Sequence, residues 1–330
     1  MAKRILVIGA VALGPKAASR CKRLMPDAEV TLIDQSSRIS YGGRGIPYFI
    51  SDEVKNVSEL QATPYGAVRN EQFFENHKDI KVLTNCRATQ INRKEKTVTV
   101  QKLVDGSSST LPYDSLVLAL GSSPNRPPIP GIELQGISAA TNLDEAEYIK
   151  NALVGKGVSH AVVVGGGFIG LELAVAIGEM WGIPTSVVEI APQVLPNFLS
   201  PSFARMAQQD LASSGIAVYA DEKVLRFEGE NGRVNKVVTN KREIPAELVI
   251  MSAGVHPNTD IAKEAGLNVT EKGLLIVDEY MRTSDPDIYA GGDCVTIPNQ
   301  VTGKPGWYPL GSMANRQGRV IGTNIFGGNA

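Results

Sequence analysis

Continuous apolar runs alternate with mixed segments along this chain, and their order predicts strands joined by helices. Residues 5–8 form one such run, which leads into a glycine turn and a helical segment and is followed by "EVTLID" at 29–34. The same order returns at 161–164, with "GGGFIG" after it and a further run that ends at Glu189. Runs without polar alternation are typical of strands buried on both faces of a parallel sheet. The pattern therefore predicts two βαβ units.

The second unit carries a complete dinucleotide-binding turn. Gly165, Gly167 and Gly170 form GxGxxG between the predicted strand and helix. Such glycines permit the tight turn, the approach of the backbone to a pyrophosphate, and the packing of helix on strand. The start of the helix offers unpaired N–H groups to the phosphates. Glu189 would accept hydrogen bonds from an adenosine ribose, and residues 190–192 hold no Lys or Arg for a 2′-phosphate, so we expect NADH rather than NADPH.

The first unit repeats this arrangement with one difference. Gly9 and Gly14 bracket its turn, Val11 stands at the middle glycine position, and Asp34 ends its second strand. One glycine-rich turn alone is a weak signal, because it can be purely structural. Two such units with terminal acids, about one domain apart, predict that electrons pass from one dinucleotide to another.

Two further segments predict small antiparallel sheets. Residues 91–120 are rich in β-formers and carry the turn signal Asp105-Gly106. Residues 224–254 repeat the pattern, with Asn231-Gly232 as a hairpin turn. We therefore predict an α/β fold with two Rossmann-like domains of the three-layer ββα type. The expected first domain is discontinuous, with the second inserted in it; the first covers 1–114 and 246–330, and the second covers 115–245.

Composition and charge narrow the class of protein. The formal net charge is −1, which gives no electrostatic case for nucleic acid or an anionic membrane. Cys21, Cys86 and Cys294 lack CxxC spacing, which favours a reducing, cytoplasmic compartment over a disulfide framework. The apolar stretches 1–14 and 161–180 could suggest membrane signals, but strand, turn and helix account for both. The histidines are not spaced as zinc ligands, so we expect neither a membrane span nor a metal.

Several ordered motifs resemble one family over nearly the whole chain. The chain is similar to the pyridine nucleotide–disulfide oxidoreductases, and most similar to their coenzyme A-disulfide reductases, NADH oxidases and persulfide reductases. That subgroup also tolerates Val in its first glycine turn, as Val11 requires. The motifs are "VIGAVALG" (7–14), "YDSLVLALGSSPNRPPIPG" (113–131), "SAGVHPNT" (252–259), "TSDPDIYAGGDCV" (283–295) and "YPLGSMANRQGR" (308–319).

The resemblance implies FAD on the first domain and NADH on the second. Asp293 would hold the ribityl chain of the flavin. The implied FAD contacts are Gly9, Val11, Ala12, Gly14, Asp34, Gln35, Ala88, Ala119, Gly121, Asp293, Leu310 and Gly311. The implied NADH contacts are Gly165, Gly167, Ile169, Gly170, Glu189 and Gly254.

Two residues at the start of the second glycine-turn helix take catalytic roles by the same resemblance. Phe168 falls where the family places an aromatic gate over the flavin, and Glu172 falls where it places an acid near the nicotinamide. The alternatives are an apolar residue that packs at a helix start and a first-turn glutamate favoured by the helix dipole.

Arg44 breaks the resemblance at the position that matters most for chemistry. The segment "SYGGRGIPY" at 40–48 matches the subgroup at every characteristic position except one, where the family has its redox cysteine. A thiolate attacks a disulfide or persulfide sulfur, whereas a guanidinium stays protonated and has no nucleophilic lone pair. Arg44 either stabilises charge at the flavin edge or on an anionic acceptor, or it points to solvent.

Basic residues on the first predicted helix leave a second question open. Arg20, Lys22 and Arg23 could meet the phosphates of a coenzyme A moiety, and a solvated helix face explains them equally well.

The function predicted from these residues is an FAD-dependent NADH oxidoreductase that reduces its acceptor without a cysteine intermediate. The acceptor would be oxygen, a quinone, a thiol or coenzyme A compound, or a redox protein. One alternative is a coenzyme A-disulfide or persulfide reductase, or an NADH oxidase, whose cysteine has been lost. Another is a flavin-bearing interaction subunit without catalysis. The sequence stops at "IFGGNA", where the family's C-terminal dimerisation domain would begin, so a homodimer stays open.

Overall fold

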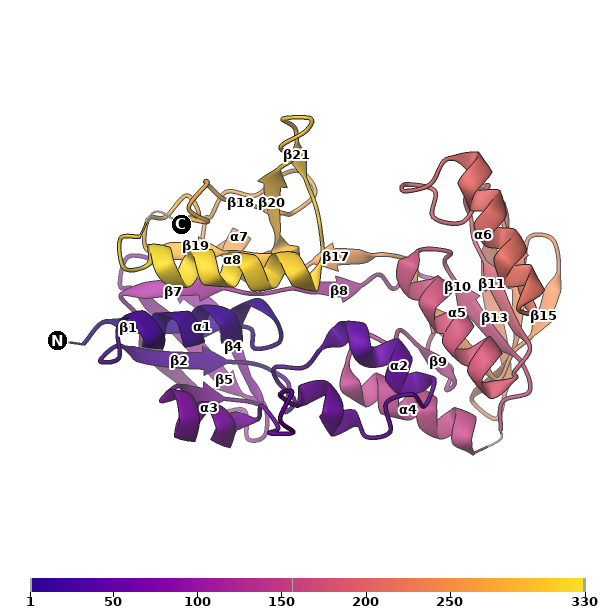
Figure 1. Ribbon diagram of the computed structural model, residues 1–330, viewed down its shortest axis with the longest axis horizontal. Helices are drawn as coiled ribbons and strands as arrows, with labels where there is room; N and C mark the ends of the chain where they lie inside the picture. Colours follow the sequence, from indigo (N-terminus) through magenta and orange to yellow (C-terminus); the bar gives the residue numbers. More distant parts are fainter. Residues whose placement is uncertain (1, 156, 329–330) are drawn as a thin grey trace. The chain divides into compact units, whose positions relative to one another are not determined.

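The computed structural model describes residues 2–155 and 157–328, and the chain divides into two compact units (Figure 1). Unit 1 comprises Met1–Gly42, Gln61–Ser123 and His256–Ala330, and unit 2 comprises Gly43–Leu60 and Pro124–Val255. The chain passes from one unit to the other through β8 (Ser122–Pro124) and β17 (Val255–Pro257), which pair with each other. No helix in the described part of the chain is both long enough and apolar enough to cross a membrane.

Unit 1 is built on a parallel sheet of five strands in the order β19-β7-β1-β2-β3. The predicted first strand and its partner form β1 and β2, in register from Arg4 opposite Glu29 to Ile8 opposite Ile33. The sheet strands are β1 (Arg4–Ile8), β2 (Glu29–Ile33), β3 (Lys81–Leu83), β7 (Ser115–Leu118) and β19 (Ile288–Ala290). The helices are α1 (Leu13–Leu24), α3 (Glu71–Lys78), α7 (Asp260–Glu264), α8 (Gly311–Asn324) and the 3₁₀ turn η3 (Gly292–Cys294).

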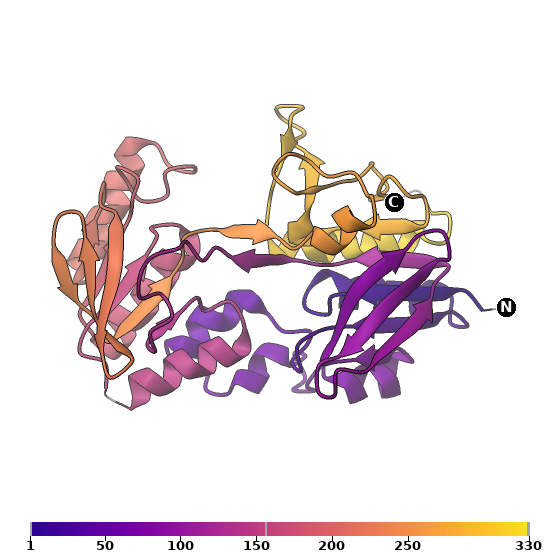
Figure 2. The same ribbon diagram turned by 180° about the vertical axis from the view of Figure 1, so that it is seen from behind.

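Helices and a second sheet cover the two faces of this parallel sheet. Helices α1 and α8 lie side by side (Figure 1), because Gly318 leaves no room for a side chain between α8 and the Leu13 carbonyl, 2.6 Å from where its Cβ would stand. The antiparallel sheet of β4 (Cys86–Asn92), β5 (Thr97–Lys102) and β6 (Ser108–Pro112) adds Val98 and Val100 to the same core (Figure 2). A further small sheet contains β18 (Leu275–Ile276), β20 (Val295–Pro298) and β21 (Pro305–Gly306).

Unit 2 repeats the architecture on the sheet β12-β11-β10-β16-β9, whose pairings are all parallel. Its strands are β9 (Ile137–Ser138), β10 (Ala161–Val164), β11 (Thr185–Val188), β12 (Ile216–Tyr219) and β16 (Leu248–Met251). Its helices are α2 (Ile46–Ile50), α4 (Leu143–Val154), α5 (Phe168–Trp181) and α6 (Pro201–Ser213), with 3₁₀ turns η1 (Gly43–Gly45) and η2 (Val57–Gln61). An antiparallel sheet of β13 (Val224–Glu230), β14 (Arg233–Thr239) and β15 (Glu243–Pro245) shares a core with the parallel sheet.

The predicted hairpin in unit 2 forms at the expected residues. Asn231 and Gly232 connect β13 to β14 with φ of 50° and 78°, the left-handed values that a tight two-residue hairpin requires. The three layers predicted for each domain are therefore present in both units.

The unit boundaries differ from the predicted domain boundaries. Residues 115–123 belong to unit 1, because β7 pairs with β1 and completes its sheet. Residues 246–255 belong to unit 2, because β16 pairs with β10. Residues 43–60, predicted within the first domain, also belong to unit 2.

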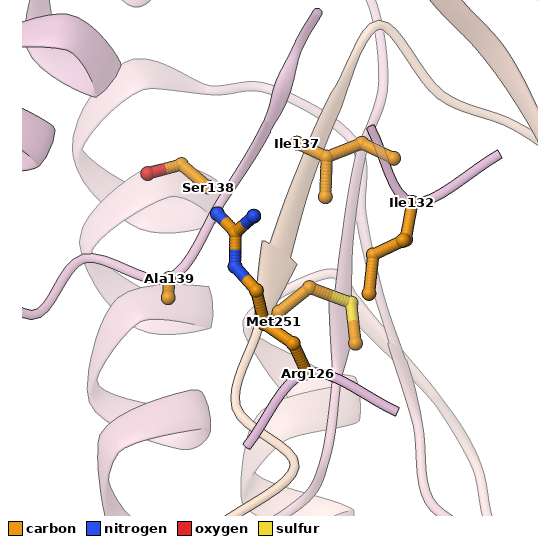
Figure 3. A pocket seen from close by; sticks show the side chains of 6 residues that line it. All are labelled: Arg126, Ile132, Ile137, Ser138, Ala139 and Met251. Carbon is orange, nitrogen blue, oxygen red and sulfur yellow. The ribbon is translucent and has the colours of Figure 1, made fainter. Parts of the chain in front are cut away.

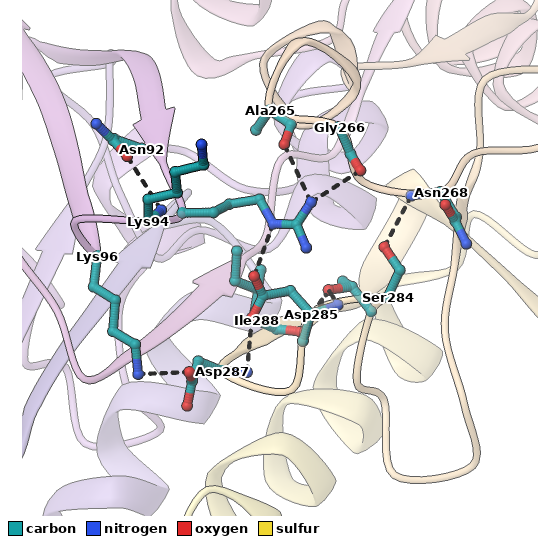
Figure 4. A network of polar contacts seen from close by, with 12 residues as sticks. Asn92, Lys94, Lys96, Ala265, Gly266, Asn268, Ser284, Asp285, Asp287 and Ile288 are labelled. Carbon is teal, nitrogen blue, oxygen red and sulfur yellow. Dashed lines mark hydrogen bonds and ion pairs between the residues drawn. The ribbon is translucent and has the colours of Figure 1, made fainter.

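A polar network ties the β4–β5 hairpin of unit 1 to two of its loops (Figure 4). Arg93 donates from Nε to Asp285 at 2.7 Å and from Nη1 to the carbonyls of Ala265 and Gly266. The neighbouring Lys96 forms an ion pair with Asp287 at 2.6 Å, and the two side chains are 47% and 38% exposed. The network holds segments together that are far apart in the sequence.

Replacing Arg93 by Met should therefore cost more stability than the matched Lys96→Met. We expect a loss of about 1–3 kcal/mol for Arg93→Met, because Asp285 is largely buried and loses its charged donor. We expect less than about 1 kcal/mol for Lys96→Met, because exposed ion pairs contribute little. Urea unfolding of both variants measures this, and equal losses would contradict the assignment.

Candidate active site

The first glycine turn of unit 1 leaves no space for side chains at two positions. Gly9 has φ of +102°, and a Cβ there would lie 2.1 Å from the Ala119 carbonyl oxygen. A Cβ on Gly14 would lie 1.8 Å from the carbonyl oxygen of Gly9. Val11 and Ala12 complete the turn before α1. The predicted residues Gly9, Gly14 and Ala119 thus meet at the carboxyl ends of β1 and β7.

Asp34 caps this turn from the end of β2. Its Oδ2 accepts the Ala10 N–H at 2.6 Å and its Oδ1 accepts the Ser36 N–H at 2.8 Å. Burial nevertheless raises the pKa of the Asp34 carboxyl, so these two donors do not fully offset its desolvation. The carboxylate is therefore short of donors, and ribose hydroxyls would supply them.

Unit 2 reproduces the same geometry at equivalent positions. Gly165 has φ of +112°, and a Cβ on Gly170 would lie 2.1 Å from the Gly165 carbonyl oxygen. Glu189 is buried, and its two oxygens accept the N–H groups of Gly166 at 2.6 Å and Ala191 at 2.8 Å. A Cβ on Gly167, by contrast, would meet nothing within 4 Å. The backbone is therefore open to a ligand at Gly167, while the other two glycines are required by the protein's own packing.

Three of the helices that begin without a side-chain cap hydrogen bond, α1, α5 and α8, start at predicted nucleotide contacts. Helices α3 and α4 begin on Asn70 and Asn142, whose side chains accept first-turn N–H groups. Helices α1, α5 and α8 have no such cap hydrogen bond. Helices α2, α6 and α7 also lack one; α2 and α6 have a proline in the first two positions, and α7 is only five residues long. Uncapped N–H groups beside open backbone suit the phosphates of a dinucleotide.

Asp293 lies in η3 of unit 1 within a second polar cluster. Ser122 Oγ donates to its carboxylate at 2.9 Å, the Gly292 N–H donates to Gln317 Oε1 at 2.7 Å, and Trp307 Nε1 donates to the Asp293 carbonyl at 2.8 Å. Burial raises the pKa of the Asp293 carboxyl. The carboxylate therefore has unmet capacity for hydroxyl donors, as a ribityl chain would provide.

The other predicted contacts lie on turns, on element ends and, for Ala88, within a strand. Gly121 has φ of +66° with open space beside it, and a Cβ on Gly311, the first residue of α8 after Leu310, would also meet nothing within 4 Å. Gln35 accepts a hydrogen bond from Arg87, which precedes Ala88 on β4. In unit 2, Ile169 is half-exposed in the first turn of α5, and Gly254 has φ of +85°.

Arg44 and Glu172 form an ion pair that the sequence did not predict. Arg44 lies in η1 and Glu172 in α5, and Nη1 donates to Oε1 at 3.0 Å. Their side chains are 60% and 44% exposed. Arg44 is thus exposed and paired with Glu172. Two of the three predicted catalytic residues share one contact.

The third, Phe168, packs against a residue that the sequence analysis missed. Its ring centroid lies 4.7 Å from that of Phe198, and the two side chains are 45% and 66% exposed. Phe198 lies in the loop before α6, with no periodic pattern around it to mark it. Neither ring is buried, so Phe168 is free to change rotamer at modest cost.

The contacts of the first helix favour a structural role for two of its three basic residues. The Lys22 ammonium donates to the carbonyls of Pro26 and Ala28 and pairs with Asp79. Arg20 Nε donates to the Thr323 hydroxyl at 3.0 Å. Arg23 is exposed. These contacts leave Lys22 poorly placed for coenzyme A phosphates.

The cysteines offer no replacement thiolate. Cys21, Cys86 and Cys294 are free and buried. Burial raises the pKa of Cys21 to about 12 and that of Cys294 to about 11, so these two thiols stay protonated at neutral pH.

A small pocket in unit 2 lies apart from the predicted contacts (Figure 3). None of the predicted site residues lines it. The buried Ser138 hydroxyl in its wall has no hydrogen-bond partner among the described residues. The lining residues are Arg126, Ile132, Ile137, Ser138, Ala139 and Met251.

Comparison with known proteins agrees with this geometry. The family model described as "Pyridine nucleotide-disulphide oxidoreductase" matches residues 3–318. The chain belongs to this family. An NADH oxidase from Methanocaldococcus jannaschii is 34% identical over 98% of this chain and 70% of its own length.

Two solved structures of family members are also similar. An NAD-dependent persulfide reductase from A. fulgidus is 42% identical with a TM-score of 0.96, over 99% of this chain and 60% of that one. An FAD-dependent pyridine nucleotide-disulphide oxidoreductase from Desulfovibrio vulgaris is 49% identical with a TM-score of 0.81, over 99% and 72%. The present chain therefore spans three-fifths of the A. fulgidus protein. The predicted family and fold class are confirmed, and with them, at the level of the family, the expectation of an oxidoreductase that uses FAD and a pyridine nucleotide.

Two glycines of the unit 2 turn should respond in opposite ways to the same substitution. Gly170→Ala should lower the stability of the protein without ligand by about 1–3 kcal/mol or more, because the new Cβ collides with the Gly165 carbonyl. Gly167→Ala should change that stability by less than about 1 kcal/mol and should instead weaken NADH binding. Thermal unfolding and NADH titration measure the two effects. A stable Gly170→Ala, or unchanged NADH affinity in Gly167→Ala, would refute this division of roles.

Proposed function

We propose that this chain is an FAD-dependent NADH oxidoreductase that passes electrons on to a small-molecule or protein acceptor without a cysteine intermediate. The observation that carries the proposal is the repeated turn, in which Asp34 and Glu189 each accept the backbone N–H next to a first glycine. Two such turns call for two dinucleotides. At position 44, an arginine paired with Glu172 stands where the resembling enzymes have their thiol.

Unit 1 would hold FAD. The uncapped start of α1 and the turn at Gly9 would receive the pyrophosphate, and Asp34 would accept hydrogen bonds from the ribose. Asp293 would accept from the ribityl hydroxyls. The raised pKa of both carboxyls supports this, because each has a desolvated charge that further donors would stabilise.

Unit 2 would hold NADH. Each Glu189 oxygen accepts one backbone N–H and retains a lone pair for a ribose hydroxyl. A 2′-phosphate would meet the Glu189 carboxylate without a basic residue at 190–192 to neutralise it. We therefore favour NADH over NADPH as the donor.

When bound, NADH supplies a hydride and the flavin accepts it, and the chain's residues position and shield the exchange. Phe168 would cover the reactive face and turn aside for the nicotinamide, as its partial exposure and contact with Phe198 permit. Arg44 would neutralise Glu172 and offer its remaining donors to an anionic acceptor. Because a guanidinium forms no covalent intermediate with sulfur, the electrons would leave the flavin directly.

The second candidate is a coenzyme A-disulfide or persulfide reductase whose cysteine has been replaced. It is favoured by the survival of every other characteristic position in "SYGGRGIPY" and by the similarity to the A. fulgidus persulfide reductase. A flavin-bearing subunit without catalysis is the third. The two experiments that follow separate all three.

Anaerobic titration with NADH should bleach the flavin with one NADH per FAD. No further equivalent should be taken up, because no cysteine at position 44 shares electrons with the flavin. Visible absorbance of the reconstituted protein reports this directly. An unbleached flavin at saturating NADH would leave only the interaction-subunit function.

Arg44→Cys should keep flavin reduction by NADH within about tenfold, a change of about 1.4 kcal/mol in the barrier, because hydride transfer needs no thiol. Arg44→Ser is the matched control, since it removes the same charge without adding sulfur. Reductase activity toward a disulfide or persulfide that appears with Cys and not with Ser would favour the replaced-cysteine candidate. Equal inactivity of both toward sulfur substrates would favour a separate acceptor.

A further inference from the structure

The segment that carries Arg44 belongs to unit 2, although the residues on both sides of it belong to unit 1. We call Gly43–Leu60 the strap. It contains η1, α2 and most of η2, and its apolar side chains Ile46, Phe49 and Ile50 are buried. Helix α2 packs against α4 and α5. At five residues α2 is far too short to be stable alone, so its position depends on these contacts.

Lys150 of α4 makes the densest polar contact with the strap. Its ammonium donates to the Asp52 carboxylate at 2.9 Å and to the carbonyls of Val54 and Lys55 at 3.1 and 3.2 Å. All three N–H donors of the ammonium are thus used. The same nitrogen lies 4.1 Å from the centroid of the Phe49 ring. The Lys150 side chain is only 10% exposed, and that of its partner Asp52 is 42% exposed.

Asp52 is the residue of the strap whose carboxylate Lys150 contacts. It has φ of +70°, in the left-handed region that few non-glycine residues adopt and in which Asp is among the commoner. Its carboxylate is shared between Lys55, at 2.7 Å, and Lys150. Replacing the ammonium would therefore leave the carboxylate with Lys55 alone and would remove this donor from the carbonyls of Val54 and Lys55.

The remaining attachments of the strap are weaker or lie elsewhere. Trp181 of α5 donates from Nε1 to the Ile50 carbonyl at 2.8 Å. The Arg44–Glu172 pair joins the other end of the strap to α5, but both partners are exposed, and exposed pairs contribute little. The pair therefore contributes little to the placement of the strap.

We propose that Lys150 is a positioning residue for Arg44: it fastens the strap to α4 and thereby keeps Arg44 within reach of Glu172. The role of Arg44 in the reaction rests on the proposed function, but the attachment of the strap to α4 by Lys150 does not. The backbone at position 44 is in this way held against unit 2, which carries Phe168 and Glu172.

The test compares Lys150→Met with the matched change Lys223→Met at an exposed lysine of the same unit. Hydrogen exchange of the intact protein should show about tenfold or greater loss of protection in residues 46–60 for Lys150→Met, with β10 and β16 unchanged. Lys223→Met and Arg44→Ala should leave the strap protected. Unchanged protection in Lys150→Met, or equal loss in Arg44→Ala, would overturn the inference.

A double-mutant cycle tests the link to Arg44. The rate of flavin reoxidation by acceptor should fall in Lys150→Met and in Arg44→Ala, and the double variant should be no slower than the slower single variant. Additive losses would mean that Lys150 does not act through Arg44. If no variant, nor the parent protein, reduces its flavin, the proposed function fails while hydrogen exchange still decides the fastening.

Discussion

The close approach of backbone to backbone at two glycines underlies both units of this molecule. At Gly14 and Gly170 the helix after the turn lies so near the preceding strand that a single Cβ would reach within about 2 Å of a carbonyl oxygen. This approach directs the uncapped N–H groups of α1 and α5 to the ends of the sheets, where Asp34 and Glu189 close the turns. The capacity to bind two dinucleotides therefore follows from packing before any ligand contact is considered.

Local patterns were sufficient to predict the parts of the fold in which neighbours in sequence are neighbours in space. The strands at 5–8 and 161–164 were predicted because burial on both faces selects apolar residues. The turn at Asn231-Gly232 was predicted because a left-handed backbone favours Asn and Gly. The unit boundaries were not, because β7 and β16 join their sheets through pairing with strands over 80 residues away. No local signal reports which sheet a short apolar run will enter.

The residues of the candidate site also divide into those that a local sequence pattern predicts and those that it does not. The glycine turns and terminal acids could be read from spacing, since each lies within one βαβ unit. The Arg44–Glu172 pair could not, because the two residues are 128 positions apart and each looks ordinary alone. Phe198 was missed because an exposed aromatic in an irregular loop has no pattern around it. The strap belongs to unit 2 and not to the unit of its flanks, which the sequence could not indicate, because its contacts include the ammonium of Lys150, some 90 residues later.

These long-range contacts bear on how far the chemistry at position 44 can differ among proteins with this fold. If Lys150 and the buried residues of α2 place the strap, Arg44 carries little of its stability, because its only ion pair in the described residues is exposed at both ends. The side chain at position 44 then contributes little to the stability of the fold. A thiol, a hydroxyl or a guanidinium would stand on the same backbone, and the acceptor chemistry would change without loss of the two nucleotide sites. Under the proposed function, an arginine in place of a cysteine would change the route by which electrons leave the flavin and would leave their supply to the flavin intact.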